Sequence, residues 1–185
     1  QQQLHLTDAL EANLGARYYS IDSKLKQSSE RATASKSDDQ LVGAASLVWQ
    51  TSDISSLRMN LAQGYTYPSL TQQFSATAGN SAMNYGNPNL KAEKATTLEM
   101  GGRVEGKQLT LDATLYHSRA KDFIDKRVFA KGAAVNGFAA CTTTHCFEWF
   151  NANKAATTGL ELLAAYQINS LRPYMNLAVQ KRQLT

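Results

Sequence analysis

The sequence contains no long apolar run. No 18 consecutive apolar residues occur among its 185 residues, which excludes a membrane-spanning helix. The mean hydropathy is −0.38, with 43% hydrophobic and 18% charged residues, as in many water-soluble domains. A transmembrane β-barrel is not excluded, because a barrel carries its apolar residues at alternate positions and its mean hydropathy stays low.

Signals for secretion and for nucleic-acid binding are also missing. The first 15 residues, QQQLHLTDALEANLG, lack the basic start and apolar core of a signal peptide. We therefore expect that such a segment was removed or that the sequence begins inside a longer protein. The formal net charge is +4, but Lys and Arg are scattered among acidic residues without a basic stripe, so nucleic acid is not an expected partner. A mildly basic surface equally suits lipopolysaccharide or another anionic ligand.

Catalytic signatures are lacking as well. The sequence has no Gly-x-Ser-x-Gly motif, no His-Glu-x-x-His motif and no pair of carboxylates on a shared loop. We therefore predict no enzyme activity and no cofactor.

Cysteine is scarce, with two residues in 185. Cys141 and Cys146 lie close together in a segment rich in Thr, Ala and Gly, which indicates a small disulfide formed in an oxidising compartment. The alternative is a metal site that uses Cys141, His145 and Cys146. That site has no fourth ligand at a recognisable spacing, so we favour the disulfide.

The dominant pattern in the sequence is an alternation of apolar and polar residues. In the segment 109–115, for example, Leu109, Leu111, Ala113 and Leu115 share one face and Thr110, Asp112 and Thr114 the other. Alternation of period two predicts β-strands with one apolar face. Seven segments show it: 10–18, 41–50, 57–62, 97–105, 109–115, 160–168 and 171–180.

The lengths of the strands and their connections favour a transmembrane barrel over a soluble sheet. Strands of ten to twelve residues at a tilt of about 40° span an apolar band of ~25 Å, whereas ordinary strands have about five or six residues. Short links near 51–55, 105–107 and 169–170 alternate with long ones near 24–39, 68–95 and 129–147. Outer-membrane barrels sort short periplasmic turns and long extracellular loops in this way. The charged faces are then expected to point into a wide lumen.

Three ordered motifs identify the family that the chain resembles. The first is Tyr65-Thr66-Tyr67-Pro68-Ser69-Leu70, and the second is Asn87-Pro88-Asn89-Leu90-Lys91-Ala92-Glu93. The third is Asn151-Ala152-Asn153-Lys154-Ala155 followed by Gly159-Leu160-Glu161-Leu162. Together they resemble the TonB-dependent outer-membrane receptors. Their signature residues would here be Pro68, Leu70, Asn87, Pro88, Leu90, Glu93, Lys154, Gly159 and Glu161.

The resemblance implies a transmembrane antiparallel β-barrel of about 22 strands with a plug in its lumen. Residues 1–185 would form a partial barrel domain, an arc of about seven long strands. The plug domain, through which these receptors contact the TonB complex, and the terminal strands would lie outside this chain. The expected location is the bacterial outer membrane, in contact with lipid and lipopolysaccharide.

Ligand contacts are expected in the long connections and the upper lumen. The candidates combine aromatic, amide and cationic side chains that suit a ring-bearing anionic chelate. They are Tyr67, Gln72, Gln73, Phe74, Tyr85, Arg127 and His145. The alternative for each is a solvated loop residue or a member of an aromatic belt at the lipid interface.

The predicted function is energy-coupled uptake of a ferric siderophore. Haem-uptake members of the family usually carry a histidine between the first two motifs, and residues 69–86 contain none, which favours a siderophore over haem. Haem, cobalamin or another ligand of the same family remains an alternative, as does a porin or adhesin barrel without a plug.

Overall fold

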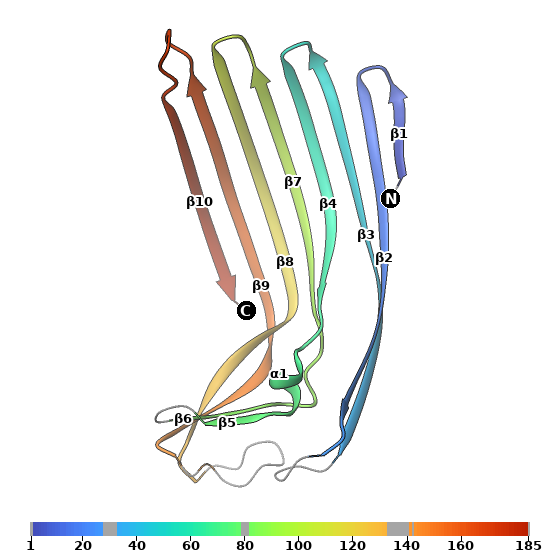
Figure 1. Ribbon diagram of the computed structural model, residues 1–185, viewed down its shortest axis with the longest axis vertical. Helices are drawn as coiled ribbons and strands as arrows, with labels where there is room; N and C mark the ends of the chain where they lie inside the picture. Colours follow the sequence, from blue (N-terminus) through green and yellow to red (C-terminus); the bar gives the residue numbers. More distant parts are fainter. Residues whose placement is uncertain (1, 28–32, 79–81, 133–140, 142, 185) are drawn as a thin grey trace.

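A computed structural model describes residues 2–27, 33–78, 82–132, 141 and 143–184. Within these residues, ten strands form a single sheet and one short helix lies at one end of it (Figure 1). Seven strands are long: β2 (Leu10–Leu25), β3 (Ala34–Ser52), β4 (Ser55–Thr66), β7 (Glu93–Glu105), β8 (Leu109–Ala130), β9 (His145–Tyr166) and β10 (Tyr174–Leu184). The shorter elements are β1 (Gln2–Thr7), α1 (Leu70–Phe74), β5 (Ala76–Ala78) and β6 (Ala82–Tyr85). The predicted arc of seven long strands is confirmed.

The long strands form an antiparallel meander. Each pairs with the next in the order β2, β3, β4, β7, β8, β9 and β10, and β1 pairs with β2. Tight turns close one end, at the top of Figure 1, and the long connections lie at the other, which we call the outer end. No helix in the described part of the chain is long and apolar enough to cross a membrane.

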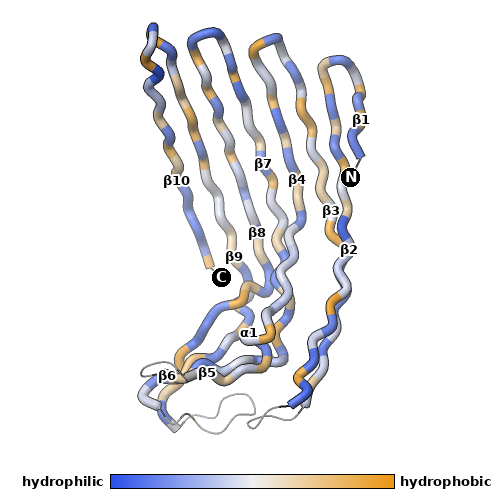
Figure 2. The backbone as a smooth tube through the Cα atoms, viewed as in Figure 1, coloured by the Kyte–Doolittle hydropathy of each residue, from blue (hydrophilic) through white to orange (hydrophobic). Residues whose placement is uncertain are grey.

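The register places the apolar residues of all seven strands on one face. Trp49 pairs with Leu10 and Leu57, for example, and Leu115 pairs with Met100 and Leu160. Figure 2 shows the resulting alternation of hydrophobic and hydrophilic residues along the strands. We call this apolar face the outward face and the opposite one the inward face.

Large apolar side chains on the outward face are open to the surroundings. Tyr18 is 64% exposed, Leu115 53% and Val179 58%. A contiguous exposed apolar surface of this extent is unfavourable in water and favourable against lipid. Trp49 and Tyr166 lie toward the tight turns and Tyr18 toward the outer end, as expected of aromatic belts at the two edges of an apolar band.

The strands extend further toward the outer end than the sequence pattern predicts. Strands β8 and β9 have 22 residues each, whereas about ten suffice to cross the apolar band. The predicted loop near 24–39 is therefore wrong for 34–39, which belongs to β3 and pairs with β2 as far as Leu25. Ser, Asp and Lys dominate residues 34–39, so this extension shows no apolar alternation although its backbone stays paired.

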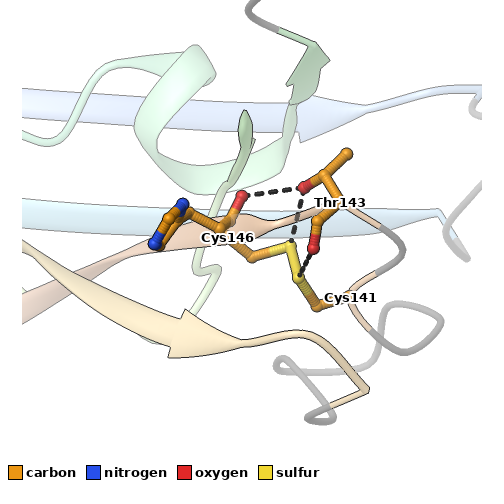
Figure 3. The surroundings of a disulfide bond; sticks show 4 residues. Cys141, Thr143 and Cys146 are labelled. Carbon is orange, nitrogen blue, oxygen red and sulfur yellow. Dashed lines mark hydrogen bonds between the residues drawn. A yellow bond between two sulfur atoms is a disulfide. The ribbon is translucent and has the colours of Figure 1, made fainter. Parts of the chain in front are cut away.

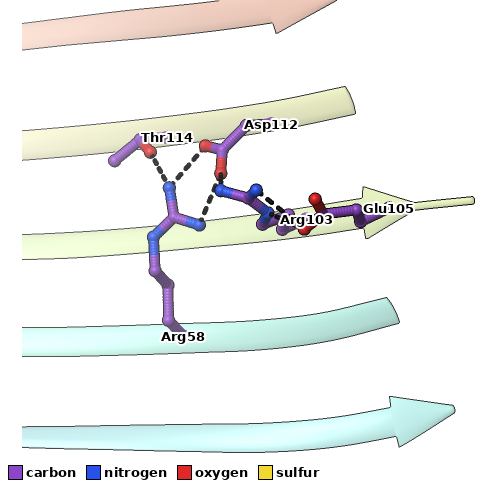
Figure 4. A network of polar contacts seen from close by, with 5 residues as sticks. All are labelled: Arg58, Arg103, Glu105, Asp112 and Thr114. Carbon is purple, nitrogen blue, oxygen red and sulfur yellow. Dashed lines mark hydrogen bonds and ion pairs between the residues drawn. The ribbon is translucent and has the colours of Figure 1, made fainter. Parts of the chain in front are cut away.

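The inward face carries a polar network over β4, β7 and β8 (Figure 4). Arg58 Nη1 and Nη2 donate to the two carboxylate oxygens of Asp112 at 3.0 and 2.6 Å, and Nη2 also donates to Thr114 Oγ1 at 2.5 Å. Arg103 donates to Glu105 and lies 4.0 Å from Asp112. To reach β8, the Arg58 side chain crosses β7 above Gly101, which pairs with both Arg58 and Thr114.

Replacing Gly101 with alanine is expected to lower the free energy of unfolding by about 1–3 kcal/mol, because the added methyl group has no room beneath the Arg58 side chain. A Cβ at this position would lie 2.9 Å from Ala113 O and 2.9 Å from Arg58 Cζ. The matched control is Gly102→Ala on the outward face, where the new Cβ would lie 3.2 Å from the flexible end of Leu57 and 3.9 Å from Ser56 O, an ordinary contact. Urea unfolding of the refolded full-length protein measures the difference. Equal midpoints for the two variants would contradict the prediction.

Candidate functional site

At the outer end of the sheet, a compact layer of structure packs beside the long strands, and we call it the outer layer. It consists of residues 68–78 and 82–92 together with the outer ends of β8 and β9 (123–130 and 145–151). Strand β6 pairs with β9 in parallel, through Ala82–His145 to Tyr85–Glu148, so the connection between β4 and β7 lies against a hairpin that follows it in sequence. Figure 1 shows β5 and β6 beside the bent outer ends of β8 and β9.

Helix α1 begins the outer layer directly after the first motif. Its N-cap, Ser69, accepts a hydrogen bond from Gln72 N, and the Gln72 side chain accepts one from Ser69 N, which forms a capping box. Gln73 is fully buried, and its amide donates to Pro68 O at 2.6 Å. Phe74 is 6% exposed. The helix therefore directs Gln73 and Phe74 into the layer.

Two asparagines tie the second motif to β8 and β9. Asn87 Nδ2 donates to Trp149 O at 3.0 Å, and its Oδ1 accepts from Asn89 N at 2.9 Å. Asn151 accepts from Lys91 N at 2.8 Å and donates to Lys91 O and Asp122 O at 3.0 and 2.7 Å. The turn that starts β7 is thus fixed to the neighbouring hairpin by side-chain amides.

Asn151→Asp is expected to loosen this turn, since a carboxylate keeps the acceptor but loses both amide donors. Two backbone oxygens lose their partner, which costs about 1–3 kcal/mol each where they are buried. The control is Asn89→Asp, whose side chain is exposed. Hydrogen exchange of the amides of Lys91 to Lys94, in the turn and at the start of β7, reports the loosening. Unchanged protection in the Asn151 variant would count against the role given to its amide.

A lysine from β3 holds the second motif from the other side. Lys36 Nζ donates to Pro88 O at 3.4 Å and also to Leu90 O. Burial lowers the pKa of Lys36, and the nearby Asp38 opposes this shift. Tyr65, near the end of β4, contacts β3 and β2 beyond the point where β3 and β4 stop pairing. Its hydroxyl donates to Asp38 at 3.0 Å, and its ring centroid lies 5.0 Å from that of Tyr19. Burial, reinforced by the bond to Asp38, raises the pKa of Tyr65.

A disulfide lies in the outer layer at the start of β9 (Figure 3). Cys141 and Cys146 are bonded, as the sequence predicts, and both are almost fully buried against Tyr85. Thr143 Oγ1 donates to His145 O at 2.8 Å and fixes the turn between the two cysteines. In the part of the chain that the structure describes, no group of three or more His, Cys, Asp or Glu side chains is placed to hold a metal ion.

An ion pair between β8 and β9 lies beside the disulfide. Arg127 Nε and Nη2 both donate to Glu148 Oε2, at 2.9 and 2.8 Å. Glu148 is 1% exposed, whereas the Arg127 side chain is 52% exposed and lies 5.1 Å from the Phe129 ring and 5.5 Å from the Phe150 ring. Glu148 Oε1 has no hydrogen-bond partner among the described residues. The pair therefore places a cation at the surface above a buried carboxylate.

The predicted ligand residues fall into three groups in the structure. Gln73, Phe74 and Tyr85 are buried, and Gln72 forms the capping box, so these four build the outer layer. Tyr67 is half-buried, with its hydroxyl 3.5 Å from Gln73 Oε1. Arg127 and His145 are exposed at the outer end.

The signature residues mostly have structural roles. Pro68 and Leu90 are fully buried, and Glu93 Oε1 accepts from Ile124 N at 2.6 Å, beside the bend where Asp122 adopts a positive φ of 55°. At Gly159 a Cβ would lie 2.4 Å from the Tyr116 ring, which crosses β9 there and donates to Gln180 at 3.2 Å. Leu70, Lys154 and Glu161 are exposed.

Three residues with contacts in the outer layer were not among the candidate ligand or signature residues, although Asn151 opens the third motif. Lys36 and Asn151 bind segments far away in the chain, at separations of 54 and 60 residues, so no local pattern marks these contacts. Glu148 had a local signal, because it is the lone acid in the aromatic run Phe147-Glu148-Trp149-Phe150. A carboxylate in such a run requires a cation, and Arg127 supplies it.

These features define the class of the protein. A long-stranded antiparallel arc with an outward apolar face, an inward polar face and structured outer connections is part of a large transmembrane β-barrel. Residues 1–182 match the family model described as TonB dependent receptor-like, beta-barrel. The chain therefore belongs to the TonB-dependent receptors, a family of receptors and transporters of the bacterial outer membrane.

Individual relatives agree with this assignment and differ in their ligands. The heme/hemopexin utilization protein C of Haemophilus influenzae is 25% identical over 171 residues, which is 80% of this chain and 24% of that protein. The copper transporter OprC superposes with a TM-score of 0.74 at 20% identity, covering 98% of this chain and 27% of the other. The siderophore receptor PirA of Pseudomonas aeruginosa gives 0.71 at 16% identity, covering 98% and 30%. The chain thus spans about a quarter to a third of the length of these proteins.

Proposed function

We propose that the chain is part of an outer-membrane receptor that takes up a ferric siderophore through a plugged barrel. Residues 1–185 would supply a partial barrel domain, and a plug elsewhere in the full protein would gate the lumen and contact the TonB complex. The observation that carries the proposal is the outer layer. This layer lies at the outer end of the sheet and is held in place by Asn87, Asn151, Lys36 and the disulfide. A structure that is already ordered suits ligand capture, because little ordering entropy is lost on binding.

The exposed residues of the outer layer suit an anionic, ring-bearing chelate. The Arg127 guanidinium lies over the Phe129 and Phe150 rings and keeps free surface because its side chain is 52% exposed. A cation beside aromatic faces binds anionic groups and stacks on ligand rings. Lys126 lies 4.5 Å from the Trp149 ring on the same hairpin and repeats this arrangement. These side chains support a siderophore as the ligand class.

Haem is the second candidate, and one observation favours it. The curated relative from Haemophilus influenzae is a heme/hemopexin utilization protein. Against it, residues 69–86 contain no histidine, and His145 is the one histidine of the outer layer. His145 is exposed at the start of β9, so it is the residue that a haem iron would have to reach.

Growth rescue under iron limitation tests the proposal. The full-length gene is expressed in a receptor-deficient strain, with catecholate siderophore, hydroxamate siderophore or haem as the iron source. We expect growth on a siderophore, at least tenfold weaker uptake in an Arg127→Gln variant and no change in His145→Ala. Growth on haem alone, abolished by His145→Ala, would replace the siderophore with haem. Growth on none of the three would refute the iron proposal.

A further inference from the structure

We propose that the inward face of β7 to β10, next to the outer layer, binds a free carboxylate of the transported ligand. The proposal rests on the proposed function, because it concerns the ligand that passes this wall, and it narrows the chemistry of that ligand. We call the place the Arg182 site. It consists of Thr97, Ser118, Thr157 and Arg182.

Strand register places these four residues side by side. Thr97 on β7 pairs with Ser118 on β8, Ser118 pairs with Thr157 on β9, and Thr157 pairs with Arg182 on β10. Directly paired residues share one face of a sheet, and residues an even number apart on one strand do so too. Ser118 lies four residues from Thr114, which belongs to the inward network. The whole row therefore faces inward.

Hydrogen bonds within the row leave donors free. Thr97 Oγ1 donates to Ser118 Oγ at 2.9 Å, and Arg182 Nε donates to Thr157 Oγ1 at 3.4 Å. A hydroxyl carries one proton besides its acceptor positions, so Ser118 and Thr157 each keep a proton to donate. The terminal nitrogens of the Arg182 guanidinium add further donors. The row thus offers two hydroxyls and a guanidinium to the same ligand group.

A small hollow lies beside these donors. It has a volume of about 140 Å³ and is lined by Ser118, Thr157 and Arg182 together with apolar side chains that include Phe123 and Leu184. Phe123 belongs to the outer layer, so the hollow lies where that layer meets the wall. An apolar hollow with a few convergent polar groups is the usual form of a ligand site, but whole drug-sized ligands need about 300 Å³ or more. The hollow therefore suits one functional group on a short arm.

Arg182 differs in its pairing from the arginines of the inward network in Figure 4. Arg58 and Arg103 both lie within 4.0 Å of Asp112. Within the ranges that the structure describes, none of the ion pairs includes Arg182. Its side chain is exposed. The guanidinium is therefore accessible to an anion that the wall itself does not supply.

The inward positions around Arg182 contribute no acid. On β8 to β10, the two rows that flank the site hold Ala120, Ala155, Leu184, Tyr116, Gly159 and Gln180. Glu99 lies in one of these rows but on β7, three strands or about 14 Å from β10, and Asn60 donates to it at 3.3 Å. The local charge is thus positive. A guanidinium fork with adjacent hydroxyls matches the two oxygens of a carboxylate.

A free carboxylate can come from two kinds of iron ligand. Some siderophores carry carboxylates that are not all bound to iron, and haem carries two propionates. The test therefore uses four probes: ferric citrate, a neutral ferric trihydroxamate, haem and haem dimethyl ester. Their binding to the purified full-length receptor in detergent is measured by quenching of intrinsic fluorescence.

The test variant is R182Q, and the matched control is R172Q, which removes the same charge from the exposed turn between β9 and β10. We expect R182Q to bind ferric citrate about 10- to 100-fold more weakly than the parent, as for the loss of hydrogen bonds to a charged group, and R172Q to change affinity less than twofold. Thr157→Val, which removes a donor without changing the charge, should weaken the same ligand about fivefold. The trihydroxamate should bind the parent and R182Q equally.

The probes also separate the two sources and the possible failures. Weaker binding of haem but not of its dimethyl ester by R182Q would assign the site to a propionate. Equal affinities of R182Q and R172Q for both carboxylate-bearing probes would overturn the proposal, as would failure of the parent to bind either of them. R182Q should melt at the temperature of the parent, because its side chain is exposed, so unfolding is excluded as the cause. Growth on a siderophore that lacks a carboxylate, unchanged in R182Q, would leave the uptake proposal standing while the carboxylate site fails.

Discussion

Gly86→Ala is expected to abolish ligand capture while the barrel wall still assembles. A Cβ at position 86 would lie 2.7 Å from Phe74 N, 2.8 Å from Gln73 C and 2.9 Å from Gln73 O. These are backbone atoms of α1, whose Gln73 and Phe74 side chains are buried, so they cannot rotate away. Gly86 N also donates to Ser75 O at 2.7 Å, which holds the two segments at this distance. One added methyl group therefore separates α1 from β6.

The matched control for this variant is Gly64→Ala at the end of β4. There the new Cβ would lie 3.6 Å from the Ala95 Cβ, an ordinary contact. Siderophore-dependent growth, limited proteolysis within 68–92 and heat-modifiable gel mobility are compared for the two. The Gly86→Ala variant should fail to support siderophore-dependent growth and should be cleaved more readily by protease, but it should keep the gel mobility of a folded barrel. The Gly64→Ala variant should resemble the parent in all three measurements. Normal growth of Gly86→Ala would show that the outer layer tolerates the displacement.

Arg127→Ala is expected to destabilise the outer layer by about 3 kcal/mol or more, because it leaves a buried carboxylate without its cation. Glu148 is 1% exposed, and Arg127 donates two hydrogen bonds to its Oε2. Hydrogen exchange of the β6 and β9 amides measures the loss, since the two strands pair at Tyr85 and Glu148. Lys126→Ala is the control, because it removes an adjacent cation that contacts an aromatic ring instead of a buried acid.

A second substitution separates the structural role of Arg127 from its proposed ligand contact. In R127A/E148Q the buried charge is gone, so exchange protection should recover to within about 1 kcal/mol of the parent. Siderophore affinity should stay low, because the exposed guanidinium is still missing. Recovery of both would make Arg127 a purely structural residue, and recovery of neither would show that the ion pair is not what stabilises this hairpin.

The wall could be predicted from the sequence because its constraints are local. The alternation of residues such as Leu109, Leu111, Ala113 and Leu115 reflects one lipid-facing side, and a slip of one residue would place Asp112 against lipid. The tight turns follow directly from where this alternation stops. The strand ends beyond the apolar band lose that constraint, which explains why 34–39 looked like a loop.

The outer layer could be predicted only in part, because its contacts join segments that are distant in the sequence. The motif Asn87-Pro88 signalled a turn, but its hydrogen-bond partner Trp149 lies 62 residues away. Strand β6 pairs in parallel with β9 across the intervening β7–β8 hairpin, and four residues of mixed character give no periodic signal. Burial of Gln73 and Tyr85 likewise depends on neighbours that only the folded chain supplies.

The parallel pairing of β6 with β9 also bears on how the outer layer can be exchanged between receptors of this family. Residues 68–92 and the β8–β9 hairpin share backbone pairing, the Asn87 amide and a buried cluster around the disulfide. A chimera that receives one of these loops without the other inherits half of an interface. The smallest transplantable module is therefore discontinuous, and recombination within this arc would conserve function only when its crossover points enclose both loops.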